Sequence, residues 1–284
     1  MRTTLLAAGG ALAVFACPAL AQDSEGPPPS EQTTVYDGDW VTVGAGAVYA
    51  PSYDGSDDYV IFPVPMVMGQ IGPVGISPRG GGIALDFIPD PEEGVAFDLG
   101  VAVGLNSNRA DKIKDPVVKA AGELDRAVEI GPSAGISIPG VLNPYDSLSF
   151  NLDARWDVAG AHDGMVMSPG LSYFTPLSRG MAGALALSAE YVDDSYADYY
   201  YSVSPTQSAA SGLPLYQAEG GFTKAGATAL LAMDLDGNLA NGGISLFGVG
   251  GYSRMLGDAK RTPYTSLRGD ADQFFAALGV GYTF

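Results

Sequence analysis

The chain has 284 residues, and its 14 Lys and Arg stand against 32 Asp and Glu, which gives a formal charge of −18. This acidic excess excludes nucleic acid as an expected partner, because phosphate binding needs clustered basic residues on an electropositive face. Cys17 is the only cysteine. This excludes a disulfide framework and any zinc, iron–sulfur or redox site built from several cysteines, and no cofactor is predicted.

The first 21 residues have the pattern of a secretory signal peptide. A basic residue precedes an apolar stretch, and the sequence ALA at 19–21 forms a small-residue cleavage site. An alternative interpretation takes VFAC as a lipidation site with Cys17 as the modified residue. Residues 22–37 are rich in Pro and polar side chains, which predicts a flexible periplasmic arm. The sequence therefore predicts an exported protein.

From residue 38 onward, large apolar residues alternate with small or polar ones, which is the period of a β-strand. In the final segment one face is apolar and, except for Ala276, carries large residues. We interpret it as a lipid-facing, aromatic-ended signal for assembly: Phe274, Leu278, Val280, Tyr282 and Phe284. Twelve such segments are predicted, at 39–50, 58–70, 72–78, 82–88, 94–106, 126–138, 146–157, 164–174, 181–192, 221–233, 242–254 and 272–284.

The connections between these segments alternate in length. One side has turn-forming clusters such as IPDPEEG and PLSRG, and the other has the long loops, including residues 193–220. This alternation is typical of an outer-membrane barrel with both termini in the periplasm, provided that YYYSV at 199–203 is an ordered part of a loop. The prediction is an all-β fold, an antiparallel transmembrane β-barrel of about twelve strands over residues 38–284. A water-soluble sandwich is the alternative that periodicity alone does not separate.

The stretch GAGAVYAPSYDGSDDYVIFPVP at 44–65 is the most distinctive in the chain. It resembles the opening hairpin of the MipA/OmpV family, the MltA-interacting proteins of the Gram-negative outer membrane, in which a P-x-Y-x-G-S-D-D-Y core precedes a P-x-P strand. ISPRGGGIALDF, DDSYADYYYSVSP and YSRMLGDA extend the similarity, while the basic loop NSNRADKIKDPVVKAAGELD departs from it. The matching positions are Pro51, Tyr53, Gly55, Ser56, Asp57, Asp58, Tyr59, Pro63 and Pro65.

The resemblance implies a role as well as a fold. The founding member of the family is described as a scaffold that joins a membrane-bound lytic transglycosylase to a bifunctional murein synthase. The resemblance therefore implies a non-enzymatic outer-membrane scaffold for peptidoglycan biosynthesis, with these two enzymes as partners. The alternative function is a narrow outer-membrane channel for small molecules with an acidic lumen.

The lumen of the predicted barrel receives several charged side chains. Such residues either line a cation-favouring pore or pair with one another and close the interior. Both interpretations remain open for the residues that alternation assigns to this face, which are Asp98, Glu129, Asp153, Arg155, Asp157 and Lys224.

Catalytic and metal sites have weaker support in the sequence. Asp57 and Asp58 could bind a divalent cation or join His162, the only histidine, in a water-activating site, but a hydrated hairpin loop around Gly55 explains the same residues. A Ser-His hydrolase would have to combine His162 with Ser147 or Ser149, whose partners are not fixed. DLDGN at 234–238 begins like a Ca²⁺ loop, but lacks the closing Glu, so we interpret it as a glycine-centred turn.

Basic residues are concentrated in two long loops predicted to be external. Arg and Lys bind phosphate groups well, so lipopolysaccharide and outer-membrane lipid are predicted partners, with simple solvation of the loops as the alternative. One loop carries Arg109, Lys112, Lys114 and Lys119. The basic residues in or directly beside the other loop are Arg254, Lys260, Arg261 and Arg268.

Overall fold

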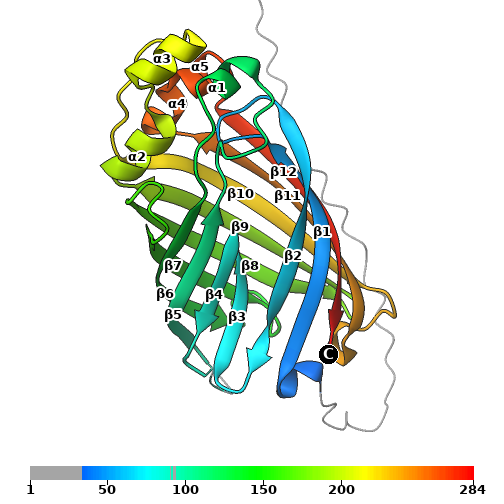
Figure 1. Cartoon of the computed structure of the whole chain (residues 1–284). Helices are drawn as coiled ribbons and strands as arrows, with labels where there is room; N and C mark the ends of the chain where they lie inside the picture. The colour runs from blue at the N-terminus through cyan, green and yellow to red at the C-terminus, as the bar shows by residue number, and fades with distance from the viewer. Residues whose placement is uncertain (1–33, 90, 92–93) are drawn as a thin grey trace, which may run out of the picture. The chain divides into compact units, whose positions relative to one another are not determined.

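Twelve antiparallel strands close into a barrel in the computed structural model, which describes residues 34–89, 91 and 94–284 (Figure 1). Strands that follow one another in sequence are neighbours in the sheet, and β12 returns to pair with β1. The predicted fold class is therefore confirmed. The strands are β1 Trp40–Pro51, β2 Tyr59–Ile71, β3 Val74–Arg79, β4 Gly82–Asp86, β5 Ala96–Asn106, β6 Ala127–Pro139, β7 Ser147–Asp157, β8 Met165–Ser178, β9 Met181–Val192, β10 Gly221–Asp234, β11 Gly243–Met255 and β12 Asp272–Thr283.

The predicted signal peptide at 1–21, with Cys17, lies outside the described residues, and so do residues 22–33 of the predicted arm. The last residues of that arm form the short 3-10 turn η1, Val35–Asp37. The side chain of Asp37 accepts hydrogen bonds from the backbone N–H and the hydroxyl of Thr34. A defined turn thus directly precedes β1, and the flexible arm stays a prediction for the residues before it.

Large apolar side chains cover the outer surface of the barrel. Leu278 is 75% exposed and Leu185 is 63% exposed, although both lie in the middle of strands. Only hydrocarbon makes such a surface stable, and an outward apolar band is the signature of an outer-membrane barrel. None of the helices in the described part of the chain is long and apolar enough to cross a bilayer.

The two ends of the barrel differ. Short turns join the strands at the end where β12 finishes, and the helices gather at the other end (Figure 1). Because outer-membrane barrels have short periplasmic turns and long external loops, we take the helical end as external and call it the cap. Within the described residues the short helices are α1 Pro116–Ala120, α2 Asp194–Tyr201, α3 Pro205–Ser211, α4 Gly257–Arg261 and α5 Pro263–Ser266, with the 3-10 turn η2 Leu239–Asn241 at the periplasmic end.

The observed strands differ from the predicted ones mainly at their ends. The strand predicted at 72–78 is Val74–Arg79, because Gly72 has a φ of +54° and forms a turn with the following proline. The strand predicted at 164–174 continues to Ser178. YYYSV at 199–203 belongs to the loop between β9 and β10, as an even number of strands requires. Its first three residues are the last residues of helix α2.

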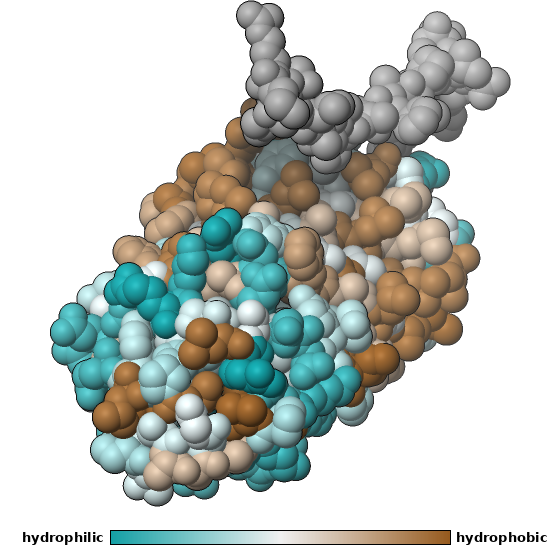
Figure 2. All heavy atoms as spheres, turned by 90° about the horizontal axis from the view of Figure 1, so that it is seen from above, coloured by the Kyte–Doolittle hydropathy of each residue, from teal (hydrophilic) through white to brown (hydrophobic). Residues whose placement is uncertain are grey.

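The best-packed apolar residues lie in the cap rather than inside the barrel. One cluster is centred on helix α2 and includes Tyr196, Tyr200 and Tyr201, which are almost completely buried. A second cluster joins Tyr53 and Tyr264 to α1 and to the segment after α2. Figure 2 looks onto this end, and shows it covered by mostly hydrophilic side chains above a hydrophobic wall.

Candidate functional site

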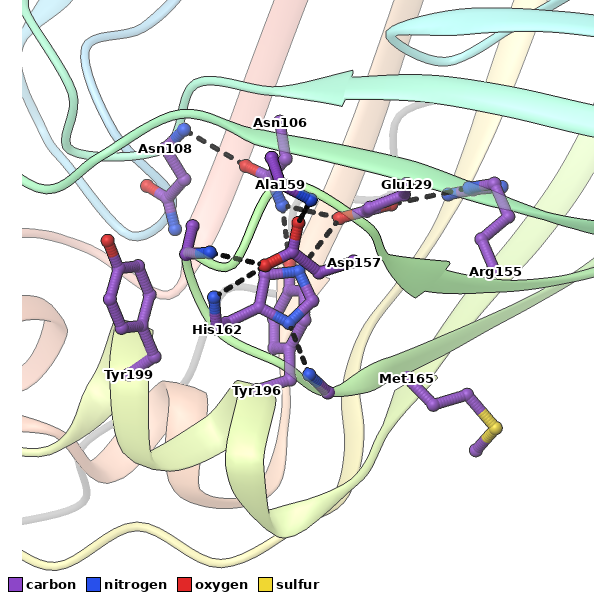
Figure 3. Close-up of polar contacts among 12 residues, drawn as sticks. Asn106, Asn108, Glu129, Arg155, Asp157, Ala159, His162, Met165, Tyr196 and Tyr199 are labelled. Carbon is purple, nitrogen blue, oxygen red and sulfur yellow. Dashed lines mark hydrogen bonds and ion pairs between the residues drawn. The ribbon is translucent and has the colours of Figure 1, made fainter.

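A network of charged side chains crosses the interior just below the cap, and Glu129 is its centre (Figure 3). Glu129 is the third residue of β6 and is only 3% exposed. Its carboxylate accepts hydrogen bonds from Nδ2 of Asn106 at 3.2 Å and from Nε of Arg155 at 3.3 Å. Nε2 of His162 lies 3.5 Å from Oε1, which is longer than an ordinary hydrogen bond. Three strands and a loop are thus linked through one carboxylate.

The loop after β7 positions His162, and Asp157 organises that loop. The Asp157 carboxylate accepts hydrogen bonds from the backbone N–H groups of residues 159, 161, 162 and 163. Nδ1 of His162 accepts the N–H of Gly164 at 3.0 Å, so a neutral ring carries its proton on Nε2, toward Glu129. The ring packs edge-on against Tyr196 of α2 at 4.8 Å. Asp157 therefore builds a loop, and His162 joins the cap to the barrel wall.

A second carboxylate, Asp153, extends the network toward β3. Its Oδ2 contacts Nε of Arg79 at 3.1 Å and Nη1 of Arg155 at 3.6 Å, and its Oδ1 accepts the hydroxyl of Ser133 at 2.6 Å. Asp153 is 1% exposed. Because Arg79 comes from β3 and Asp153 from β7, the ion pair braces strands that are not neighbours in the sheet.

Lys224 and Asp98, the two predicted lumen charges that lie outside this network, also have partners. Nζ of Lys224, on β10, lies 3.2 Å from Asp54 of the β1–β2 loop and 3.3 Å from Glu190 of β9. Asp98 lies on the inner face of β5 opposite Gly135, where an added Cβ would come within 2.4 Å of its carboxylate. Of the two interpretations of the lumen charges, this arrangement favours an interior that is braced by paired charges.

The family-motif loop between β1 and β2 lies against the β11–β12 loop. The Tyr53 side chain is buried, and its hydroxyl donates to the carbonyl oxygens of Tyr264 and Arg268. Gly55 has a φ of +90°, and an added Cβ would come within 2.1 Å of Oγ1 of Thr265. Burial raises the pKa of Tyr53 above its ordinary value, so the hydroxyl stays a donor. The loop is therefore packed rather than hydrated.

The other motif positions continue this packing around the same loop and the start of β2. Ser56 is fully buried and bridges to Gly269, Asp57 is exposed, and Asp58 closes the loop through its carbonyl, which accepts the N–H of Ser52. The Tyr59 ring stacks on Tyr49 at 5.0 Å. Pro51 ends β1, whereas Pro63 and Pro65 lie on the outward face of β2.

The predicted basic loops do not present all their charges to the outside. Arg109 is 1% exposed, lies 3.7 Å from the ring centroid of Tyr264 and donates to the carbonyl oxygen of Tyr200. The expectation that Arg109 meets lipopolysaccharide is therefore wrong, because the loops of the cap close over it. The other residues of this group fall into two sets. Those that are exposed and form no ion pair with a described carboxylate are Lys112, Lys114, Lys119 and Lys260, and those paired with a carboxylate are Arg254, Arg261 and Arg268.

Asp115 fastens helix α1 to the β11–β12 loop. Its carboxylate accepts the backbone N–H groups of Val117 and Val118, both at 2.9 Å, and Nε of Arg268 at 3.1 Å. Burial alone would raise the pKa of Asp115, but these hydrogen bonds and the Arg268 charge outweigh it and hold the pKa below its usual range.

The described residues do not assemble any of the weighed catalytic or metal sites. Ser149 donates or accepts a hydrogen bond with Ser137, and it lies eight residues along β7 from the His162 loop, about 26 Å away in an extended strand. Asp57 and Asp58 make no contact with His162 among the described interactions. Asp234 and Asp236 accept backbone N–H groups within their own turn, and no described group of three metal-ligating side chains occurs.

Four residues of the predicted assembly signal lie on the outer face of β12, and the fifth, Phe284, follows its last residue. All five are exposed: Phe274, Leu278, Val280, Tyr282 and Phe284. The pairing of β12 with β1 closes the barrel. Their role in assembly stays a prediction.

Sequence reasoning missed several members of the interior network. Arg79 lies on the inward face of the short strand β3. The alternation of residues along this strand was the sequence signal that could have identified it. Asp54 and Glu190 gave no signal, because their partner Lys224 is more than thirty residues away from each.

Comparisons with known proteins place this arrangement in context. No functionally curated protein matches the sequence. Among solved structures, the chain is similar to an outer membrane channel from Pseudomonas putida F1, at 12% identity and a TM-score of 0.44, with 91% of this chain and 100% of that chain covered. It is also similar to the toluene transporter TodX of Pseudomonas putida, at 9% identity and a TM-score of 0.35, with 87% and 89% covered.

A match to a protein family is found at the level of sequence and also covers most of the chain. The family described as "MltA-interacting protein MipA" matches residues 43–284, from the first strand to the last. The matched range contains the motif loop, the interior network and the cap. The chain therefore belongs to the MipA family.

Proposed function

We propose that this protein is a non-enzymatic outer-membrane anchor that holds murein-remodelling enzymes, a lytic transglycosylase and a bifunctional murein synthase, at its periplasmic end. The observation that carries the proposal is the match over residues 43–284 to a family described as MltA-interacting. The braced interior supports it, because paired charges and a covered external end do not favour permeation.

The β6–β7 turn is the part of the periplasmic end best suited to contact a partner. Leu142 is 78% exposed and Tyr145 is 77% exposed. The turn is rigid, because the Asp146 carboxylate accepts the N–H groups of residues 141–143 and the hydroxyl of Tyr173. Exposed aromatic and aliphatic side chains held in one conformation lose little entropy on binding.

A stable interface usually needs about 800 Å² on each partner, which is more than one turn supplies. The segment from Asp86 to Ala96 and the residues before β1 would have to contribute as well. The proposal therefore treats Leu142 and Tyr145 as anchors within a wider surface.

The test uses the purified full chain, immobilised in detergent, and a soluble form of the lytic transglycosylase. The Leu142→Ala/Tyr145→Ala variant should lower the affinity at least fivefold, since two exposed anchors are removed without disturbing Asp146. The matched control is Leu215→Ala/Leu267→Ala, which truncates two similarly exposed side chains in the cap loops at the opposite end. The proposal fails if the control weakens retention as much, or if the wild-type chain does not retain the enzyme.

A narrow channel for small molecules is the second candidate. It is favoured by the acidic residues that face the interior, but Glu129 and Asp153 each contact an arginine and Glu190 contacts a lysine. A conductance measurement in planar bilayers distinguishes the two candidates, because a channel gives discrete current steps and a closed anchor does not.

A further inference from the structure

The ladder of the barrel wall is incomplete beside β2. This strand pairs with β1 along its whole length, from Tyr59 to Gln70, but with β3 only from Gly69 to Ile71. β3 and β4 are short, with 6 and 5 residues, and the pairing of β3 with β2 stops at Ile76 although β3 continues to Arg79. No described strand pairs with residues 59–68 on that side, and Figure 1 shows β2 parting from the β3–β4 hairpin toward the cap. We call this gap in the ladder the seam.

The sequence of β2 is suited to an edge that stays unpaired. Residues alternate in directing their backbone groups to the two neighbouring strands, and Ile71 and Gly69 direct theirs to β3. Pro63 and Pro65 are an even number of residues from Gly69, so their backbone groups also point to the side of the seam. A proline has no N–H to donate, and on this side β2 has no neighbouring strand to which it could donate one. At membrane depth, unpaired backbone is tolerated only where it lines a cavity or contacts protein. The unpaired backbone of β2 at the seam therefore needs contact from another group.

The interior behind the seam is apolar, in contrast to the charged side near β6 and β7. The inward face of β2 carries Val60, Phe62, Val64, Met66 and Met68, all of which are partly exposed. Glycines on the adjacent strands leave room for these groups.

Two contacts show how close this packing is. An added Cβ at Gly44 would come within 3.2 Å of Cε of Met66, and one at Gly281 would come within 2.8 Å of the ring of Phe247. The ring of Phe275 occupies the space above Gly251 in the same way. The apolar side of the interior thus extends from the seam across β1, β12 and β11.

Two cations lie at the cap end of the seam. Nζ of Lys112 is 5.0 Å from the ring centroid of Phe62, and Nζ of Lys114 donates to the carbonyl oxygen of Tyr59. Both lysines are exposed, and neither has a carboxylate partner among the described ion pairs. The seam therefore combines an apolar inward face of β2 with a positively charged upper rim.

We propose that the seam binds a single-chain anionic amphiphile, whose acyl chain enters the apolar side of the interior and whose head group is held by Lys112 and Lys114. The chemistry fits both parts of the molecule, because a chain buries apolar surface and a carboxylate or phosphate pairs with ammonium groups. This inference is independent of the proposed anchoring role, which involves the opposite end of the barrel.

The test reads the position of a brominated fatty acid from its quenching of a tryptophan in the full chain, reconstituted in nanodiscs. Both native tryptophans are replaced, by Trp40→Phe and Trp156→Phe, and one reporter is added. Val64→Trp places the reporter on the inward face beside the seam, and Val67→Trp places it on the outward face of the same strand. Heat-modifiable migration on gels verifies that each variant is folded.

Binding at the seam predicts saturable quenching of the reporter at position 64 and a linear, partition-like response at position 67. Oleate and dodecyl phosphate, tested separately as a carboxylate and a phosphate amphiphile, should both compete, whereas inorganic phosphate without an acyl chain should not. Lys112→Glu/Lys114→Glu should weaken competition by oleate at least fivefold and leave competition by oleyl alcohol unchanged.

The proposal is overturned if the reporter at position 64 responds linearly or not at all. The head-group assignment is overturned if the lysine substitutions change oleate and oleyl alcohol equally. Retention of the transglycosylase is measured on the same variants, and the anchoring proposal is unaffected by either result.

Discussion

At the scale of single residues, the interior charges act as structural braces. Removing one partner from a buried ion pair leaves the other charge desolvated, which costs more than the pair itself contributes. Glu129 contacts both Arg155 and His162, so it joins the barrel wall to the loop after β7. Asp153 shares Arg155 with it.

Glu129→Gln is expected to destabilise the barrel by about 3 kcal/mol, because the buried guanidinium of Arg155 loses the negative charge beside it and one acceptor oxygen becomes an NH2 donor. The free energy of unfolding is measured by urea titration of the barrel in lipid vesicles. The control, Glu123→Gln, changes an exposed side chain and should alter stability by less than about 0.5 kcal/mol. Equal effects of the two substitutions would contradict the bracing role.

Alternation along β6 and β7 is sufficient to put Glu129 and Asp153 on one face of the sheet, because side chains of a strand point alternately to its two sides. Their partners could not be predicted. Arg79 reaches Asp153 from β3, and Asn106 reaches Glu129 from the end of β5. Such pairings depend on how the barrel closes, and no local sequence pattern records that.

At the scale of elements, the strands were predictable and the cap was not. Each strand carries its own period, whereas the cap helices are short and lie within segments that also have the composition of loops. Their stability comes from contacts between distant segments, such as Tyr53 with Tyr264, 211 residues apart. Helix α1 has a local signal in its Asp-Pro start, but five residues are too few to predict a helix from sequence alone.

Acid is expected to loosen helix α1. The folded pKa of Asp115 lies below its ordinary value, so its carboxylate stabilises the cap above about pH 4, and this contribution is lost as pH falls further through the lowered pKa. Asp115→Asn keeps a capping oxygen and removes the charge that Arg268 pairs with.

Hydrogen exchange at the amides of Val117 and Val118, corrected for intrinsic rates, tests this expectation. At pH 6 the wild-type amides should exchange up to about fivefold more slowly than those of Asp115→Asn, and at pH 3 this difference should be smaller. A difference that is the same at both pH values would show that the charge of Asp115 is irrelevant.

At the scale of the whole molecule, the structure combines a lipid-facing wall, a braced interior and a packed external cap. The wall is stable only in hydrocarbon, and the cap buries its own tyrosines rather than leaving a mouth between the loops. These features favour a barrel that holds its place in the membrane and presents its periplasmic end to other proteins.

The central claim, that the interior is closed by its own paired charges beneath the cap, is tested most directly by conductance. The purified full chain is inserted into planar bilayers, and insertion is verified by heat-modifiable migration of the reconstituted protein. The account predicts no discrete current steps for the wild-type chain, and their appearance in Glu129→Gln or in a variant without residues 257–266, where the braces or the cap are lost. Regular cation-selective steps from the wild-type chain that weaken on Asp153→Asn would contradict it.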